Sequence, residues 1–205
     1  MKRVLIWLVL CCLGTGLLWG KKYQVREIHV RPATEYATHQ DFQEMVFAGL
    51  AFNTQETIQG IFDTKALFKR GIMPILIVIE NRNNFAVRVH ADDIYLIDPD
   101  NVHHRALRLE DVLIAVAFDR PLSSVSTGQG VPRGKINRNL SSDFEHKAFG
   151  EKLIAPGGSD HGVVFFPLSQ GEALHKGRLY LPEIYNITEN EPLIFFEFEL
   201  NVAQP

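Results

Sequence analysis

The first twenty residues differ from the rest of the chain in their pattern of apolar and polar positions. Residues 4–19 carry no charge, and a pair of basic residues stands on each side of this run. A positive head followed by an apolar core is the layout of a secretory signal. The run is shorter than the roughly 20 apolar residues of a comfortable transmembrane helix. We therefore expect residues 1–20 to be a signal peptide or an N-terminal membrane anchor, and the pattern leaves open whether the segment is cleaved or retained.

Beyond residue 20, alternating apolar and polar positions predict a series of strands. Residues 72–80 form an almost unbroken apolar run rich in β-branched side chains, which predicts a central strand buried on both faces. In residues 193–202, Phe196 and Phe198 share one phase, and Phe195 shares the other with acidic residues. One face of this strand should therefore meet solvent. Residues 23–31 and 44–52 are predicted to be strands or extended segments, and the other predicted strands cover residues 85–90, 93–97, 162–166 and 178–185.

Apolar positions at helical spacing predict two or three short helices between the strands. Thr54 and its polar neighbours resemble a helix cap, and residues 55–70 then fit a helix of about four turns. Residues 109–118 carry a second apolar stripe, and residues 141–143 predict the cap of a brief helix that runs to residue 149. Residues 122–140 are rich in Ser, Gly and Asn, which predicts a flexible loop near residues 120–140.

Short strands separated by turn signals favour a mainly β fold. Residues 21–205 are long enough for one domain with its own hydrophobic core. We therefore predict a single exported domain over residues 21–205, built as an immunoglobulin-like antiparallel β-sandwich with two or three added short helices.

Composition and charge exclude several classes of function. Both cysteines, Cys11 and Cys12, lie in the N-terminal segment, so the rest of the chain can form neither disulfides nor thiolate metal sites. Removing residues 1–20 takes away Lys2 and Arg3 and no acid, so the formal net charge of −3 becomes −5. Nucleic acid is not an expected partner, because its binding needs a basic face. Beyond residue 22 the sequence has no run of Lys and Arg that would hold it to an anionic lipid surface.

Three segments carry a resemblance to a known group of proteins. They are residues 71–81, residues 87–97, and residues 153–158 leading to the strand at 162–166. Together they resemble uncharacterised bacterial exported or lipoprotein-type proteins with an immunoglobulin-like β-sandwich domain. The resemblance implies a domain that faces the cell envelope or periplasm, and it maps no shared catalytic residues onto this chain.

The same resemblance raises the question of lipidation at Cys11 or Cys12. Bacterial lipoprotein signals end at a cysteine after a short apolar run, usually with a small residue directly before it. Here Leu10 precedes Cys11, and an apolar stretch follows Cys12. The alternative is that both cysteines are small apolar residues of the signal core, and the sequence does not decide between the two.

The histidines suggest a metal site without a recognisable motif. His90, Asp92 and Asp93 lie close together in the sequence, and His161 or His39 could join them from a distant loop. Such a set would suit a metal-dependent hydrolase. Clusters without a motif are more often turn and surface residues. The serine in residues 157–161 only superficially resembles a nucleophile elbow and is interpreted as part of a turn.

Aromatic residues near the C-terminus allow a third hypothesis. Such side chains at strand spacing can line a groove for a small ligand or glycan, although they more often fill the core of a sandwich. The residues concerned are Tyr180, Tyr185, Phe195, Phe196 and Phe198.

We therefore predict a non-enzymatic cell-envelope protein that acts as a binding or assembly module. It needs no cofactor, its expected partner is another envelope protein, and it is attached to the membrane through the N-terminal segment. Loops at the ends of the sandwich, especially residues 120–150, should make the contacts. The alternatives are the metal-dependent hydrolase and the small-ligand or glycan-binding domain.

Overall fold

The computed structural model describes residues 22–90, 93–126, 134–167, 177–182, 184–193 and 195–204. The strands are β1 (Gln40–Phe42), β2 (Met45–Ala51), β3 (Ile72–Asn81), β4 (Val87–His90), β5 (Tyr95–Ile97), β6 (His103–Arg105), β7 (Glu151–Ile154), β8 (Ser159–Pro167), β9 (Arg178–Leu181), β10 (Ile184–Asn186), β11 (Glu191–Pro192), β12 (Phe196–Glu199) and β13 (Asn201–Val202). The helices are a 3-10 helix at Ala33–Glu35 and α2 (Gln55–Ile61), α3 (Ala66–Lys69), α4 (Leu109–Ala117), α5 (Leu122–Ser126) and α6 (Arg138–Lys147).

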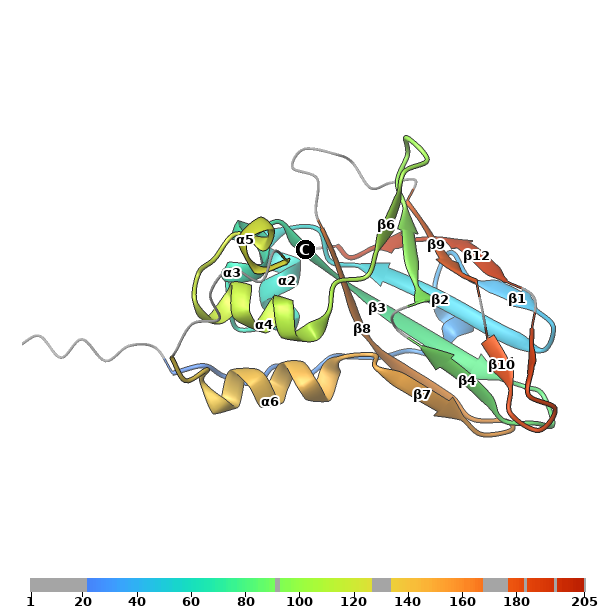
Figure 1. The fold of residues 1–205 in the computed structure, drawn as a ribbon. Helices are drawn as coiled ribbons and strands as arrows, with labels where there is room; N and C mark the ends of the chain where they lie inside the picture. The colour runs from blue at the N-terminus through green and yellow to red at the C-terminus, as the bar shows by residue number, and fades with distance from the viewer. Residues whose placement is uncertain are drawn as a thin grey trace, which may run out of the picture.

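A central sheet organises the molecule (Figure 1). Its order is β1-β2-β3-β8, and β13 adds to β2 in parallel. β3 pairs along its length with β2 on one side and β8 on the other, both antiparallel. All but one of its residues are buried. The sequence prediction of a central strand buried on both faces is confirmed.

Two smaller sheets cover one face of the central sheet. Their orders are β11-β10-β4-β7 and β12-β9-β5-β6. The core between the layers contains alternate residues of each facing strand, such as Ile75 and Ile77 of β3, Val87 of β4 and Leu179 of β9. Period-2 alternation places such residues on one face of their strands. The result is an antiparallel β-sandwich.

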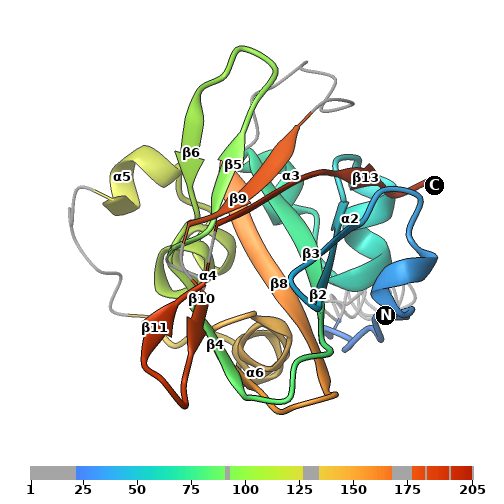
Figure 2. The same ribbon diagram turned by 90° about the vertical axis from the view of Figure 1, so that its right-hand side faces the viewer.

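Helices cover the opposite face of the central sheet, as Figures 1 and 2 show. A second core lies there, formed by the other phase of β2, β3 and β8 together with α2, α3, α4 and α6. Phe62 fills its centre, with its ring centroid 4.2 Å from Phe144 of α6 and 5.8 Å from Phe165 of β8. The chain crosses between layers in the turn from β7, which pairs with β4, to β8, which pairs with β3. There Gly162 is required, because an added Cβ would lie 2.5 Å from the backbone of Phe149.

The segment at residues 23–31, predicted as a strand or an extended segment, is extended and belongs to none of the sheets in the described part of the chain. Residues 22–32 form an extended segment, here called the strap, whose β pairing in the described part of the chain is one bridge between Val25 and Phe62. The strap lies against helices rather than beside a free sheet edge. Its alternation arises because Tyr23, Ile28 and Val30 pack on the helical core while their neighbours face solvent.

The predicted helix at residues 55–70 is broken in two. Thr54 does cap α2, as expected, by accepting a hydrogen bond from the Thr57 N–H at 3.2 Å. The chain then becomes extended at Phe62 (φ −131°, ψ 125°), which drives the ring into the core before α3 begins. Apolar spacing alone does not distinguish this insertion from a continuous helix.

Three other segments differ from their predicted form. Residues 122–126 of the predicted loop form helix α5, while residues 127–133 lie outside the described part. Helix α6 starts at Arg138 with Asn137 as its cap, so that residues 141–143 are interior to it. The strand predicted at 178–185 is two strands in different sheets, with Pro182 between them. Proline lacks the N–H that a continuous ladder needs.

The predicted fold class, a mainly antiparallel β-sandwich with added short helices, is confirmed. The described residues contain five short α-helices where two or three were expected. Among these described helices, none has the length and apolar character required to span a bilayer.

Candidate functional site

The outer face of the sheet β12-β9-β5-β6 presents aromatic side chains to solvent. Inward residues of this sheet, such as Leu96, Leu179 and Phe196, belong to the core. The cross-strand pairs Tyr95 with Tyr180 and Tyr180 with Glu197 therefore lie on the outer side. The side chains of Tyr95, His103, Tyr180 and Phe195 make up what is here called the aromatic face.

Tyr180 lies at the centre of the aromatic face. Its ring centroid is 5.6 Å from Phe195, 6.5 Å from Tyr95 and 6.3 Å from His103. Phe195 is 52% exposed, and the two tyrosines are half-buried. Large apolar rings gathered on a surface are a feature of interaction sites, whereas single exposed apolar residues are ordinary.

A polar rim runs beside these rings. Arg178 of β9 forms an ion pair with Glu197 of β12, and its Nη2 donates to Asn101 Oδ1 at 2.9 Å. Because the planar guanidinium holds both partners at once, it ties the tip of the β5–β6 hairpin to the far strand of the sheet. The rings and the rim thus form one continuous surface.

The β5–β6 hairpin is held by Asp98. This buried carboxylate accepts hydrogen bonds from the Val102 N–H and from His104 Nε2, each at 2.8 Å. The His104 bond, and then the Val102 bond, hold the pKa of Asp98 below its ordinary value of 3.8. The charged form of Asp98 is therefore the one that braces the hairpin beneath the aromatic face.

We expect this bracing to weaken in acid. A carboxylate with a depressed folded pKa contributes stability above its unfolded pKa, and that contribution is lost as the pH falls through the folded pKa. The difference in unfolding free energy between the wild-type protein and Asp98→Asn should thus shrink as the pH falls below 3.8. Urea titrations at several pH values measure it. Asp100→Asn, which removes an exposed carboxylate of the same turn, is the control; an equal pH effect there would contradict the assignment.

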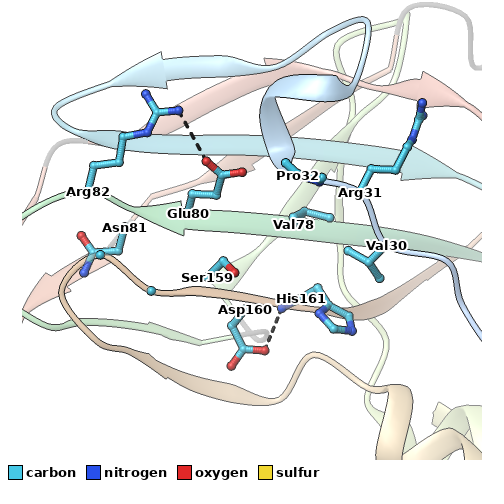
Figure 3. A pocket seen from close by; sticks show the side chains of 12 residues that line it. Val30, Arg31, Pro32, Val78, Glu80, Asn81, Arg82, Ser159, Asp160 and His161 are labelled. Carbon is cyan, nitrogen blue, oxygen red and sulfur yellow. Dashed lines mark hydrogen bonds and ion pairs between the residues drawn. The ribbon is translucent and has the colours of Figure 1, made fainter.

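A groove of about 510 Å³ lies on the other side of the molecule (Figure 3). The strap forms one wall, and side chains of β3 and β8 line the rest. The acidic side chains that line this groove already interact with neighbouring groups of the fold. Glu80 accepts from the Ala33 N–H at 2.6 Å, and Asp160 lies 3.1 Å from Lys152 Nζ.

Ser159 and His161 both line this groove from β8. No hydrogen bond joins their side chains within the described residues, and the His161 N–H donates to Asp160. A nucleophile and its base need to lie within hydrogen-bond reach, although this contact is often looser before substrate binds. The geometry therefore gives no support to a serine nucleophile here. The turn predicted at residues 157–161 ends at Gly158, because Ser159 and His161 already belong to strand β8 and pair with β3.

The structure separates the residues of the metal hypothesis. His90 lies on β4, in the phase that points away from the core, and its Nε2 is 3.8 Å from Glu151 Oε1. His161 pairs with Val78 and faces the strap and helices on the opposite side of the sandwich. Asp93 is half-buried between β4 and β5, and Asp92 lies outside the described residues. In the part of the chain that is described, no three His, Cys, Asp or Glu side chains are grouped as metal ligands.

The structure places the five aromatic residues of the ligand-groove hypothesis in different parts of the fold. Phe196 and Phe198 are core residues, whereas Tyr180 and Phe195 belong to the aromatic face. Tyr185 lies in the other small sheet, with Arg88 stacked at 5.4 Å over its ring. Tyr95 and His103 were not anticipated as site residues. Cys11 and Cys12 lie outside the described residues, so lipidation remains a prediction.

Comparison with known proteins gives similarity in structure alone. No protein-family model and no curated protein matches the sequence. The fold aligns with the crystal structure of the YjhA protein from Bacillus subtilis, at 10% identity over 80% of this chain and 96% of that one, with a TM-score of 0.41. It also aligns with the secreted protein MPT63 from Mycobacterium tuberculosis, at 9% identity over 83% of this chain and 98% of that one, with a TM-score of 0.34. Similarities of this size do not assign a function.

Proposed function

We propose that this chain is a non-enzymatic binding module of the cell envelope that docks another protein on its aromatic face. The observation that carries the proposal is the gathering of Tyr95 and Phe195 around a half-buried Tyr180, with 52% of Phe195 exposed. Envelope location itself rests on the apolar segment of residues 4–19 and its basic flanks.

The residue types of this surface suit a protein partner. Tyr, Phe and Arg are enriched at the centres of protein interfaces, where aromatic rings are desolvated and a polar rim surrounds them. Arg178, Glu197 and Asn101 supply such a rim beside the rings. A complementary partner would present an apolar side chain for Tyr180 and Phe195, with polar groups around it.

The preference for a protein over a small ligand rests on the residue types of the aromatic face. Small-molecule sites are concave and enclose most of the ligand. Within the described residues, the strap borders three grooves of about 510, 410 and 320 Å³, and none of the residues that line them belongs to the aromatic face. A glycan laid across the rings is the alternative, because aromatic faces can also stack on flat ligands.

Site-specific crosslinking in native membranes tests the proposal. A photo-crosslinking phenylalanine analogue at Phe195 should yield a protein adduct of discrete mass. The same analogue at Leu153 is the control, since this side chain is 66% exposed but lies on β7 in the other small sheet. Tyr180→Ala should lower the adduct yield at position 195 strongly, since truncating a central interface residue costs about 2 kcal/mol or more, roughly 30-fold in Kd.

Equal adduct yields at positions 195 and 153, or a yield at 195 that Tyr180→Ala leaves unchanged, would overturn the proposal. Absence of any protein adduct, combined with Tyr180-dependent retention on immobilised glycans, would assign the aromatic face to the glycan alternative instead.

A further inference from the structure

Basic side chains gather at one end of the helical layer although they are scattered along the sequence. This group, here called the basic end, contains exposed residues from the start of the strap, from α3 and from the segment that leads into α6. Its members are Lys22, Lys65, Lys69, Lys135 and Arg138.

Contacts within the fold bring these segments together. The strap binds the α2–α3 connection, because the Gln24 N–H donates to Asp63 Oδ2 at 3.1 Å. Arg70, which follows α3, donates from Nε to Asp119 Oδ1 at 3.0 Å. Gly134 in turn lies against the ring of Phe118. Figure 1 shows α3, α5, the start of α6 and the first described residues of the strap at the same end of the molecule.

The acidic residues at this end are already engaged. Asp63 Oδ2 accepts a hydrogen bond from the Gln24 N–H of the strap, and Asp63 Oδ1 lies 3.4 Å from Arg26 Nη2. Asp119 forms an ion pair with Arg70. Among the described residues, none forms an ion pair with the five members of the basic end. The end therefore carries a positive field on a chain whose formal net charge is −3.

An exposed apolar side chain and the first described residue of the chain lie at this end. Phe68 is 38% exposed and lies on α3 between Lys65 and Lys69. Lys22 is the first described residue, and the uncharged run of residues 4–19 precedes it closely in the chain. Positive side chains around an exposed ring, next to an apolar segment, fit an anionic bilayer surface.

We infer that the basic end rests on a membrane surface that contains anionic lipids, with Phe68 facing the headgroups. This contact is separate from the aromatic face and does not depend on the function proposed for it. It adds to whatever attachment the N-terminal segment provides, because each Lys or Arg near a negative surface strengthens binding. The sequence does not reveal the cluster, because its charges are gathered by the fold from segments more than a hundred residues apart.

The full-length chain in vesicles tests the inference. Cys11→Ser and Cys12→Ser remove the native thiols, and Phe68→Cys then carries one fluorophore. Quenching by a headgroup-located quencher should be several-fold stronger with about 30% phosphatidylglycerol than with phosphatidylcholine alone. About 0.5 M NaCl should abolish the difference, because salt screens exposed charges. A fluorophore at Leu153→Cys should be quenched weakly and equally in both membranes.

Charge reversal separates this contact from general electrostatics. Lys65→Glu with Lys69→Glu should reduce quenching at position 68 to its level in phosphatidylcholine. Arg31→Glu with Arg108→Glu makes the same change in net charge elsewhere on the surface. This second pair of substitutions should leave quenching at position 68 unaltered. Quenching at position 68 that is equal in the two lipid compositions, or that responds equally to both pairs of substitutions, would overturn the inference.

Discussion

Replacing Asp143 with Ala is expected to lower the free energy of unfolding by about 3–5 kcal/mol. The Asp143 side chain is 1% exposed and lies 2.6 Å from Lys147 Nζ, which is itself 8% exposed. Removing one member of a buried ion pair leaves the other charge without compensation in a medium that solvates it poorly. Urea unfolding followed by circular dichroism measures the loss as a shift of the midpoint.

The pair joins three parts of the helical layer. Lys147 Nζ donates to the Ile61 carbonyl at the end of α2 at 2.7 Å and lies 4.9 Å from the centre of the Phe62 ring. The Tyr23 hydroxyl donates to Asp143 Oδ2 at 2.6 Å, and burial together with this carboxylate raises the pKa of Tyr23. Tyr23 therefore remains a hydrogen-bond donor, and Asp143 fastens both the strap and α2 to α6.

A double variant distinguishes the ion pair from simple loss of packing. Asp143→Leu with Lys147→Met removes both charges and keeps apolar volume, so it should recover most of the stability that Asp143→Ala loses. A residual cost of about 1–2 kcal/mol is expected, because Tyr23 and the Ile61 carbonyl lose their partners. If the double variant were less stable than Asp143→Ala, the ion pair would not be the source of the effect.

The ion-pair network around Asp143 also shows why some parts of the fold cannot be predicted from the sequence pattern. β3 was predictable because its apolar run exceeds what any exposed element could carry. The strap was predictable only as a strand or extended segment, because the partners that decide between the two, Asp63 and Asp143, lie on or beside helices far along the chain. The pattern of apolar and polar residues along a segment indicates which side of it is buried, but it does not identify the residues that cover that side.

The candidate site was predictable in part for a related reason. Phe195 belongs to the polar phase of its strand, and that phase alone marks the side chain as outward-facing. Tyr95 and Tyr180 stand on different strands, and only the register of β5 against β9 places them opposite each other. The metal hypothesis fails to gain support in the described residues because proximity in sequence around His90 says nothing about the distance to His161 across the sandwich.

Replacing Phe47 with Ala is expected to destabilise the protein by about 3–5 kcal/mol without altering the aromatic face directly. Phe47 of β2 is fully buried, with its ring centroid 4.2 Å from Phe196 and 6.0 Å from Phe198 of the facing sheet. Truncation removes one of the apolar contacts between the two layers and leaves a cavity that a packed core fills only in part. Urea unfolding again measures the change.

Phe195→Ala is the matched comparison, because Phe195 is the immediate neighbour of Phe196 but points outward and is 52% exposed. It should cost at most about 1 kcal/mol of stability, since the side chain is largely solvent-exposed and its ring pair among the described residues is with Tyr180. Under the proposed function, Phe195→Ala should nevertheless weaken partner binding, whereas Phe47→Ala should reduce the amount of folded protein and leave the affinity of the folded fraction unchanged. A large stability loss for Phe195→Ala would show that the aromatic face serves packing rather than recognition, since a side chain kept for binding contributes little to the fold.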